Sequence, residues 1–342
     1  MATIQAIAHK VGVSTETVSR VLNRGALSSR SDAVRRAEHI RAVARQLGYR
    51  SNAAAKAIST GRFGSVALVQ STHWGRSTLP GFLINGVSRA LARDDLSLLL
   101  TQLPDEELVS KGYLPKFMRQ NMCDGLLINY TDHIPAPLFA RLREGSVPCI
   151  WLNTKLPHDC VYPDDAQGAA MLTQTLIKAG HRAIAYADCS HGLDQKSPHY
   201  SALDRENGYR QAMDDAGLNP RVVRPATTLE GHARADFSEQ WLARSPRPTA
   251  VVCNSSGTAI PLALAAARLG LRVPADLLIA SHDNVAETIA GTPFPTAVVP
   301  QEQMGRTAVE MLLRKLENPE VSLPAKALAF PLNAGHLVGP RN

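Results

Sequence analysis

Three segments near the start of the chain carry apolar residues at helical spacing, over residues 4–11, 15–23 and 31–47. Gly12 permits a turn between the first two segments, and Ser14 is placed to cap the second. The second helix would bury its apolar face against the first and leave short polar and arginine side chains outside. This pattern indicates a helix-turn-helix that reads DNA in the major groove. An ordinary helical hairpin at the start of a larger domain is the alternative.

Residues 49–62 form a different kind of segment. They can form a short helix, but they offer little apolar surface to bury, so this helix should be marginal in isolation. We interpret the segment as a conditional linker.

From Gly64 onward, buried-strand patterns alternate with amphipathic helices, as in a parallel α/β sheet. Strands are expected at 65–69, 96–100, 125–128, 148–152, 183–187, 221–224, 250–253 and 277–281, and helices at 82–93, 113–121, 166–179, 205–216, 260–269 and 301–317. Short terminal strands are expected after the last helix. This count fits two doubly wound lobes with a ligand cleft at the carboxyl ends of their strands. The expected fold is therefore an all-α helix-turn-helix head followed by a two-lobed α/β core with doubly wound parallel sheets.

Length and composition agree with this organisation. The 342 residues exceed one typical core, so two or three domains are expected, and 44% apolar residues suffice to fill them. No cationic apolar leader opens the sequence and no uncharged apolar run could cross a bilayer, which predicts a cytoplasmic protein. The cysteines are odd in number and lack a close pair, so we interpret them as mostly buried apolar residues and expect neither disulfides nor zinc. They are Cys123, Cys149, Cys160, Cys189 and Cys253.

Charge is concentrated in the first fifth of the chain. Residues 1–62 hold 11 Lys or Arg against three acidic residues, whereas the remaining residues hold 26 basic and 27 acidic ones. The whole net charge of +7 thus resides in the head and linker. A solvated helix face would explain Arg35, Arg36, Arg41 and Arg45, but their place beside a helix-turn-helix favours phosphate contacts.

Signatures of catalysis are missing from the sequence. It holds no phosphate-cradling glycine loop, no nucleophile elbow and no histidine pair at metal-binding helical spacing. We expect no enzyme, no catalytic residue, no metal and no cofactor. A two-lobed binding module without DNA binding is the rival class, and the basic head argues against it.

Ordered motifs across nearly the whole chain resemble the lactose/galactose repressor (LacI/GalR) family of bacterial transcription regulators. The most specific blocks are 12–23 and 47–55, and further matches are 123–128, 180–185, 205–209, 216–218, 269–276 and 305–308. The resemblance implies a DNA-binding head at 1–48, a hinge helix at 49–62, and a periplasmic-binding-protein-like core at 63–342. Its N-lobe would comprise 63–162 and 300–326, and its C-lobe 163–299 and 327–342.

The resemblance also implies roles for residues of the head. Thr15, Glu16 and Arg20 match positions that reach base edges, where Arg20 can hold a guanine and Glu16 can accept from a cytosine amino group. Simple stabilisation of the helix N-terminus is the alternative for Glu16. The other DNA-binding positions are Thr3, Ser14, Thr17, Ser19 and Asn23, which match backbone-contacting residues, together with Tyr49, Asn52, Ala55 and Ile58 around the hinge.

Some residues depart from the family pattern. Ala6 stands where Asp is usual, Ser51 stands where Pro is common, and the span from Asn23 to Tyr49 is about one helical turn longer. Ile58 replaces the usual Leu that wedges into the minor groove, and its similar volume should still unstack a base step.

The effector site is expected at the strand ends that face the cleft. Arg205 matches an arginine that holds effector hydroxyls or carboxylates, although a surface ion pair is the alternative. Asn254 matches the Asn of an Asn–Asp pair in which Ser255 replaces Asp, and Asp283 matches an aspartate after a strand. The other candidates are Ser71, His73, Trp74, Tyr130 and Asn153, and Asn129 stands at the same edge.

Two aromatic and two histidine candidates carry open alternatives. Stacking on a sugar competes with lobe packing for Trp74 and Tyr130. His191 and His199 precede Arg205 and are interpreted as a solvated loop rather than as cleft lining.

The resemblance finally implies a repressor that binds double-stranded operator DNA as a dimer, associates with the bacterial nucleoid and has no membrane partner. No apolar heptad tail follows Leu337, so we expect no tetramer. A sugar or sugar acid is the leading effector hypothesis, and a nucleobase-type corepressor is second. A regulator that answers to a partner protein instead is a further alternative.

Overall fold

The computed structural model describes residues 2–24, 31–50, 57, 60–73, 77–104, 120, 122–131, 134, 137–139, 142, 147–195, 198–286, 288–289 and 291–340. These residues form two compact units. The first comprises residues 1–65 with 120–124, and the second comprises 66–119 with 125–342. The predicted helix at 113–121 lies almost entirely outside the described residues.

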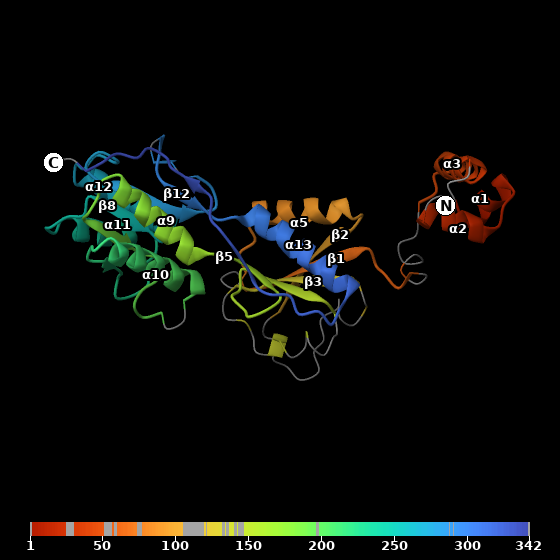
Figure 1. Ribbon diagram of the computed structural model, residues 1–342, viewed down its shortest axis with the longest axis horizontal. Helices are drawn as coiled ribbons and strands as arrows, with labels where there is room; N and C mark the ends of the chain where they lie inside the picture. The colour runs from red at the N-terminus through yellow and green to blue at the C-terminus, as the bar shows by residue number, and fades with distance from the viewer. Residues whose placement is uncertain are drawn as a thin grey trace. The chain divides into compact units, whose positions relative to one another are not determined.

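The first unit begins with three helices, α1 (Ile4–Val11), α2 (Thr15–Arg24) and α3 (Ser31–Gln46) (Figure 1). Gly12 follows α1 with a φ of 72°, a left-handed conformation that costs glycine little. Ser14 Oγ accepts a hydrogen bond from the backbone N–H of Thr17 at 3.1 Å, which caps α2 as predicted. The expected helix-turn-helix is confirmed.

One apolar core joins these three helices. Its buried members are Ile7, Ala8, Val18, Val21, Ala37, Ile40, Val43 and Ala44. They recur at the helical spacing from which the helices were predicted, so the polar side chains of α2 lie on its outer face.

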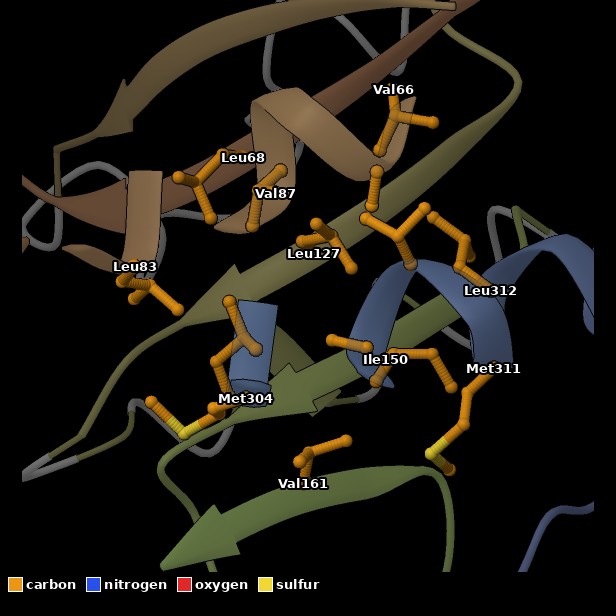
Figure 2. Close-up of a cluster of buried hydrophobic side chains, with 14 of the residues drawn as sticks. Val66, Leu68, Leu83, Val87, Leu127, Ile150, Val161, Met304, Met311 and Leu312 are labelled. Atoms are coloured by element: carbon orange, nitrogen blue, oxygen red, sulfur yellow. The ribbon is translucent and has the colours of Figure 1, made fainter. Parts of the chain in front are cut away.

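The N-lobe of the second unit is built on a six-stranded sheet in the order β13-β5-β4-β3-β1-β2. Its strands are β1 (Ser65–Ser71), β2 (Ser97–Leu103), β3 (Gly125–Asn129), β4 (Cys149–Leu152), β5 (Cys160–Pro163) and β13 (Lys326–Leu328). Helices α5 (Gly81–Arg93) and α13 (Gln301–Glu317) lie side by side over this sheet (Figure 1). Figure 2 shows Met304 and Leu312 of α13 packed with Leu127 and Ile150 of the sheet.

The C-lobe is built on a second six-stranded sheet in the order β14-β12-β9-β8-β6-β7. Its strands are β6 (Ile184–Ala187), β7 (Arg221–Val223), β8 (Ala250–Cys253), β9 (Leu278–Asp283), β12 (Thr296–Val298) and β14 (Leu332–Asn333). Its helices are α9 (Asp165–Lys178), α10 (Tyr200–Asp215), α11 (Ala233–Leu242) and α12 (Ser256–Arg268). All neighbouring strands pair in parallel except β12 and β14. A short hairpin joins β10 (Thr288–Ile289) to β11 (Thr292–Pro293).

Glycines allow helices to pack closely in each lobe. A Cβ on Gly208 of α10 would lie 2.1 Å from the carbonyl oxygen of Ala166 in α9. A Cβ on Gly305 of α13 would lie 2.7 Å from the carbonyl oxygen of Leu83 in α5. Side chains at these positions would force both helix pairs apart.

The structure differs from the predicted elements in several places. Helix α11, strands β5 and β12 and the β10–β11 hairpin were not predicted, and α10 begins five residues before the predicted start at Arg205. Strand β5 ends at Pro163 and β13 ends at Leu328. Within the described ranges, no helix is long and apolar enough to span a membrane.

Candidate DNA-binding surface and effector site

The outer face of α2 presents the side chains expected to read bases. Thr15, Glu16 and Arg20 are exposed, and the Arg20 guanidinium pairs with the Glu16 carboxylate one turn away. With 44% of its side chain exposed, Arg20 stays accessible to a DNA partner. The carboxylate of Glu16 therefore competes with DNA for the same guanidinium.

Three residues expected to contact the DNA backbone take part in helix capping. Thr3 Oγ1 accepts from the N–H of Ala6 at 3.2 Å and caps α1. The hydroxyls of Ser14 and Thr17 are hydrogen-bonded at 2.9 Å, beside the cap of α2. Such caps orient the first turn of each helix, where backbone N–H groups attract phosphate.

The remaining head positions are described in part. Ser19 is half-buried on α2, and Tyr49 packs against the core of the three helices. The side chain of Asn23 and the hinge positions Asn52, Ala55 and Ile58 lie outside the described residues.

A cavity of about 140 Å³ lies between the two lobes of the second unit. Its lining from the N-lobe and crossing segments includes Asn129 at the end of β3, Asn153 after β4 and Gln301 at the start of α13. Its lining from the C-lobe includes Asp165 at the start of α9 and Arg205 on α10. The cavity thus lies at the carboxyl ends of parallel strands, where sequence placed the effector site.

Arg205 is fixed in the cavity wall by two hydrogen bonds. Its Nε donates to Asp165 Oδ1 and a terminal nitrogen donates to the backbone carbonyl of Asn254, each at 2.6 Å. The side chains of Arg205 and Asp165 are 12% and 1% exposed, so the alternative of a surface ion pair does not describe this residue. These bonds use two of the five N–H donors of the guanidinium.

Burial and charge act in opposite directions on this pair. Burial raises the pKa of Asp165, and the attraction of Arg205 opposes that shift without cancelling it. Burial lowers the pKa of Arg205, but attraction and hydrogen bonding to Asp165 together with the nearby Tyr186 and Tyr200 outweigh it, and the net pKa shift is upward. The guanidinium therefore stays charged and can hold a carboxylate or hydroxyl of a ligand.

Three buried acceptor atoms in the cavity lining lack a hydrogen-bond partner within the described part of the chain. They are Asn129 Oδ1, Asp165 Oδ2 and Gln301 Oε1. Leaving a buried acceptor unpaired costs about 1–3 kcal/mol, so such groups call for a partner. A ligand that carries several convergent O–H or N–H donors would supply it.

Asn153 joins the two lobes beside the cavity. Its backbone carbonyl lies 3.1 Å from His199 Nε2, and its Oδ1 accepts from the hydroxyl of Tyr200 at 2.9 Å. An ion pair of 2.7 Å between Lys155 and Asp204 adds a further contact between the lobes. His199 lines the cavity, so its interpretation as part of a solvated loop was wrong.

Other predicted effector residues lie outside the cavity lining. Asn254 supports Arg205 through its carbonyl, and its Oδ1 accepts from the hydroxyl of Tyr186 at 3.0 Å. Asp283 Oδ2 accepts from the N–H of Ser256, the first residue of α12. Both residues hold elements of the C-lobe in place.

The effector candidates at the ends of β1 and β3 include both buried and exposed side chains. Ser71 is buried and its Oγ accepts from the N–H of His73, whose side chain is exposed. Tyr130 is fully buried and its hydroxyl donates to the carbonyl of Leu103 at 3.3 Å, as lobe packing requires. Trp74 lies outside the described residues.

Asp165 and Gln301 were missed from the sequence as cavity residues. Each is the first residue of a helix, where an acid or amide is ordinarily interpreted as a favourable partner for the helix N-terminus. Their position in the sequence could have identified them as cavity residues. Both helices begin just after a proline, Pro163 or Pro300, where the chain crosses between the lobes.

Comparison with known sequences places two segments in described families. Residues 3–52 match the model of bacterial regulatory proteins of the lacI family, and residues 173–330 match a periplasmic binding protein-like domain. The HTH-type transcriptional repressor PurR of Pectobacterium carotovorum is 29% identical over 92% of this chain and 91% of its own length. The ribose operon repressor of Escherichia coli is 28% identical over 93% and 94%.

Solved structures share the fold. The Lac repressor dimer bound to operator and the anti-inducer ONPF superposes with a TM-score of 0.74 at 20% identity, covering 99% of both chains. The complex of the transcriptional regulator CelR with cellobiose gives 0.63 at 23% identity, covering 98% of this chain and 100% of that chain. These likenesses confirm the predicted head and two-lobed α/β core.

Proposed function

We propose that this chain, which belongs to the lacI family of bacterial regulatory proteins, represses transcription as an operator-bound homodimer. An effector bound in the interlobe cavity controls this repression. Family membership makes the chain a DNA-binding transcriptional regulator and not an enzyme.

The unpaired acceptors of Asn129, Asp165 and Gln301 are the observation that carries the effector proposal. A sugar or sugar acid presents several hydroxyl donors on one compact ring, and a carboxylate or hydroxyl of that ring would meet Arg205. The relatives named as ribose operon repressor and as a regulator complexed with cellobiose support a carbohydrate.

A nucleobase corepressor is the second candidate, because its N–H groups would satisfy the same acceptors. A planar base also needs an aromatic face on which to stack. Among the described residues that line the cavity, His199 supplies the one aromatic ring. A hydroxyl-rich ligand is therefore favoured over a planar base.

The size of the cavity gives the effector a mechanical role. Ligand pockets ordinarily enclose about 300–1,000 Å³, and this cavity encloses about 140 Å³. An effector therefore enters only when the lobes separate, which breaks the contacts of Asn153 with His199 and Tyr200. The effector thus acts on the equilibrium between lobe arrangements, and it shifts DNA affinity by its preference for one of them.

The operator-binding part rests on the exposed face of α2 and on the charge of the head. Selection of duplexes from a random library by the full-length protein would reveal the operator. We expect an inverted repeat with a central C-G step that disappears with Arg20→Ala, because Arg20 supplies a base-edge contact. Arg45→Ala, an exposed position on α3, is the matched control and should weaken all duplexes alike. An unchanged motif with Arg20→Ala would contradict the assigned base contact.

The effector part is tested by thermal unfolding with pentoses, hexoses, sugar acids and nucleobases. We expect sugars or sugar acids to raise the Tm of the wild-type protein. Gln301→Met removes an unpaired acceptor at similar side-chain length, so it should abolish most of the ligand-induced shift. Gln303→Met, an exposed neighbour on α13, should retain the shift. If only nucleobases raise the Tm, a nucleobase becomes the favoured effector class in place of a sugar or sugar acid.

A further inference from the structure

A second cavity lies in the C-lobe, between the edge strand of its sheet and α11. Strand β7 ends the sheet order, and α11 packs beside it through Trp241. The cavity between them encloses about 300 Å³. None of its lining residues is shared with the interlobe cavity.

The charge of this cavity has a single sign. Three of its eight lining residues are arginines, namely Arg221 and Arg224 at β7 and Arg244 just after α11. All eight are described residues, and none of them is acidic. Positive charges that line one hollow and have no carboxylate partner repel each other, and an anion between them would relieve that repulsion.

The three arginines differ in what already binds them. Arg224 pairs with Glu206 Oε2 at 2.8 Å and lies 3.7 Å from Asp188 Oδ2, so its charge is already compensated. Arg221 donates to the carbonyl of Pro246 at 2.8 Å, and its guanidinium carbon lies 5.7 Å from the centroid of the Trp241 ring. Arg244 makes no ion pair with any acidic residue that the structure describes. Arg221 and Arg244 therefore keep a positive charge that no carboxylate within the described ranges neutralises.

Two buried donors in the same lining lack an acceptor among the described residues. They are Nε1 of Trp241, a residue that is 7% exposed, and Nε of Arg224. Buried N–H groups are almost always paired in folded proteins, because an unpaired donor loses its hydration without compensation. An anionic acceptor would both accept from these donors and neutralise the guanidinium charge of Arg221 and Arg244.

We propose that this cavity binds a small phosphorylated metabolite, with its phosphate held by Arg221 and Arg244 and by donors of Arg224 and Trp241. Planar guanidinium groups donate paired hydrogen bonds that match the oxygen spacing of phosphate. The volume of about 300 Å³ exceeds that of the ion itself and leaves room for its organic part. The regulator would then carry a second ligand site, chemically distinct from the acceptor-lined interlobe cavity.

Calorimetric titration of the full-length protein with glycerol 3-phosphate tests the site, with glycerol as the uncharged match. Ionic strength is held constant so that non-specific screening does not change. We expect saturable binding of one glycerol 3-phosphate per chain and no binding of glycerol. Arg244→Gln should weaken the affinity about tenfold, because it removes a charge-assisted contact. Arg247→Gln, an exposed arginine outside the lining, should leave the affinity unchanged.

Three outcomes would overturn the proposal. The first is the absence of saturable binding to the wild-type protein. The second is equal weakening by Arg244→Gln and Arg247→Gln, which would assign the anion to diffuse surface charge. The third is binding that survives Arg244→Gln but is lost with Gln301→Met, which would place the anion in the interlobe cavity. None of these outcomes bears on operator binding, and only the third bears on the effector of the interlobe cavity. The operator proposal and the anion-site proposal can therefore fail separately.

Discussion

Arg205 Nε lies 2.6 Å from Asp165 Oδ1, and this bond joins α10 to the first residue of α9 at the wall of the interlobe cavity. The pair places a permanent positive charge beside an acceptor oxygen, Asp165 Oδ2, that has no partner among the described residues. A ligand can therefore both donate to the carboxylate and accept from the guanidinium. A hydroxyl-rich ligand can do both, whereas a simple anion can only accept.

Arg205→Lys should lower effector affinity at least tenfold while operator binding by the head persists. Lysine retains the charge but not the planar fork that bonds to Asp165 and Asn254 together. Arg205→Gln should in addition lower the free energy of unfolding by about 3–5 kcal/mol, because it leaves a buried carboxylate without its partner. Ligand titration and urea unfolding of both variants measure the two effects. Equal effector affinity in wild type and Arg205→Lys would exclude a role for the fork.

Glu16→Gln should tighten binding to non-specific DNA and reduce discrimination between operators. The substitution removes a carboxylate near the phosphates and releases Arg20 from its ion pair. Binding assays on operator and scrambled duplexes across a salt series measure both effects. Asp32→Gln is the matched control, since Asp32 forms a similar exposed ion pair with Arg35 on α3. If Glu16 only stabilises its helix, the two variants will discriminate equally well between operators.

A homodimer requires a surface that a second copy can cover. Ile260 and Leu264 lie one turn apart on α12 and are 54% and 49% exposed. Such neighbouring exposed apolar side chains are typical of an interface. Ile260→Glu combined with Leu264→Glu should convert the dimer to a monomer in sedimentation experiments and weaken operator binding. Leu193→Glu, at a loop position that is 71% exposed, should leave the dimer intact. A dimer that persists in the double variant would place the interface elsewhere.

The strongly periodic elements were predictable because burial follows their sequence pattern. Helix α13 was expected at 301–317 and spans Gln301–Glu317, with its apolar stripe facing the N-lobe sheet. Helix α11 was missed because Ala235 and Ser238 are buried beside Trp241, and such small residues do not stand out as an apolar stripe. Ser238 is buried because other parts of the C-lobe pack around it, and the sequence near Ser238 does not reveal those contacts.

The sequence predicted some residues of the candidate site correctly and others incorrectly. Arg205 and Asn153 lie at the cavity because the ends of parallel strands meet there. Tyr130 follows a strand in the same way, yet its ring is buried and its hydroxyl is bound to Leu103 from another strand. Only the tertiary structure distinguishes these two outcomes, because the deciding partner is distant in sequence.

Gly208→Ala should destabilise the C-lobe by about 1–3 kcal/mol or more, as overpacking does. The added Cβ would lie 2.1 Å from the carbonyl oxygen of Ala166, so α9 and α10 must separate. Because Asp165 adjoins that contact, effector affinity should fall together with the free energy of unfolding. Gly81→Ala, where a Cβ would meet nothing within 4 Å, should be neutral. Similar urea midpoints for the two variants would show that the helices separate without cost.

His282→Asn should remove part of the loss of stability that the wild-type protein shows in acid. His282 is fully buried, and burial, together with the charge of Arg205, lowers its pKa well below the ordinary 6.5. The unfolded chain therefore binds a proton below about pH 6.5 that the folded chain does not, and folding becomes less favourable by about 1.4 kcal/mol per pH unit. Above that pH the histidine is neutral in both states and contributes no pH dependence.

Asparagine can replace the donor that His282 Nδ1 offers to the carbonyl of Cys253, but it cannot take up the proton. The variant should therefore show a shallower decline of unfolding free energy between pH 6.5 and 5. His336→Asn, at an exposed position, should retain the wild-type slope. Urea unfolding at half-unit pH intervals measures these slopes. Parallel profiles for all three proteins would mean that water reaches His282 in the folded state and that its pKa is not lowered.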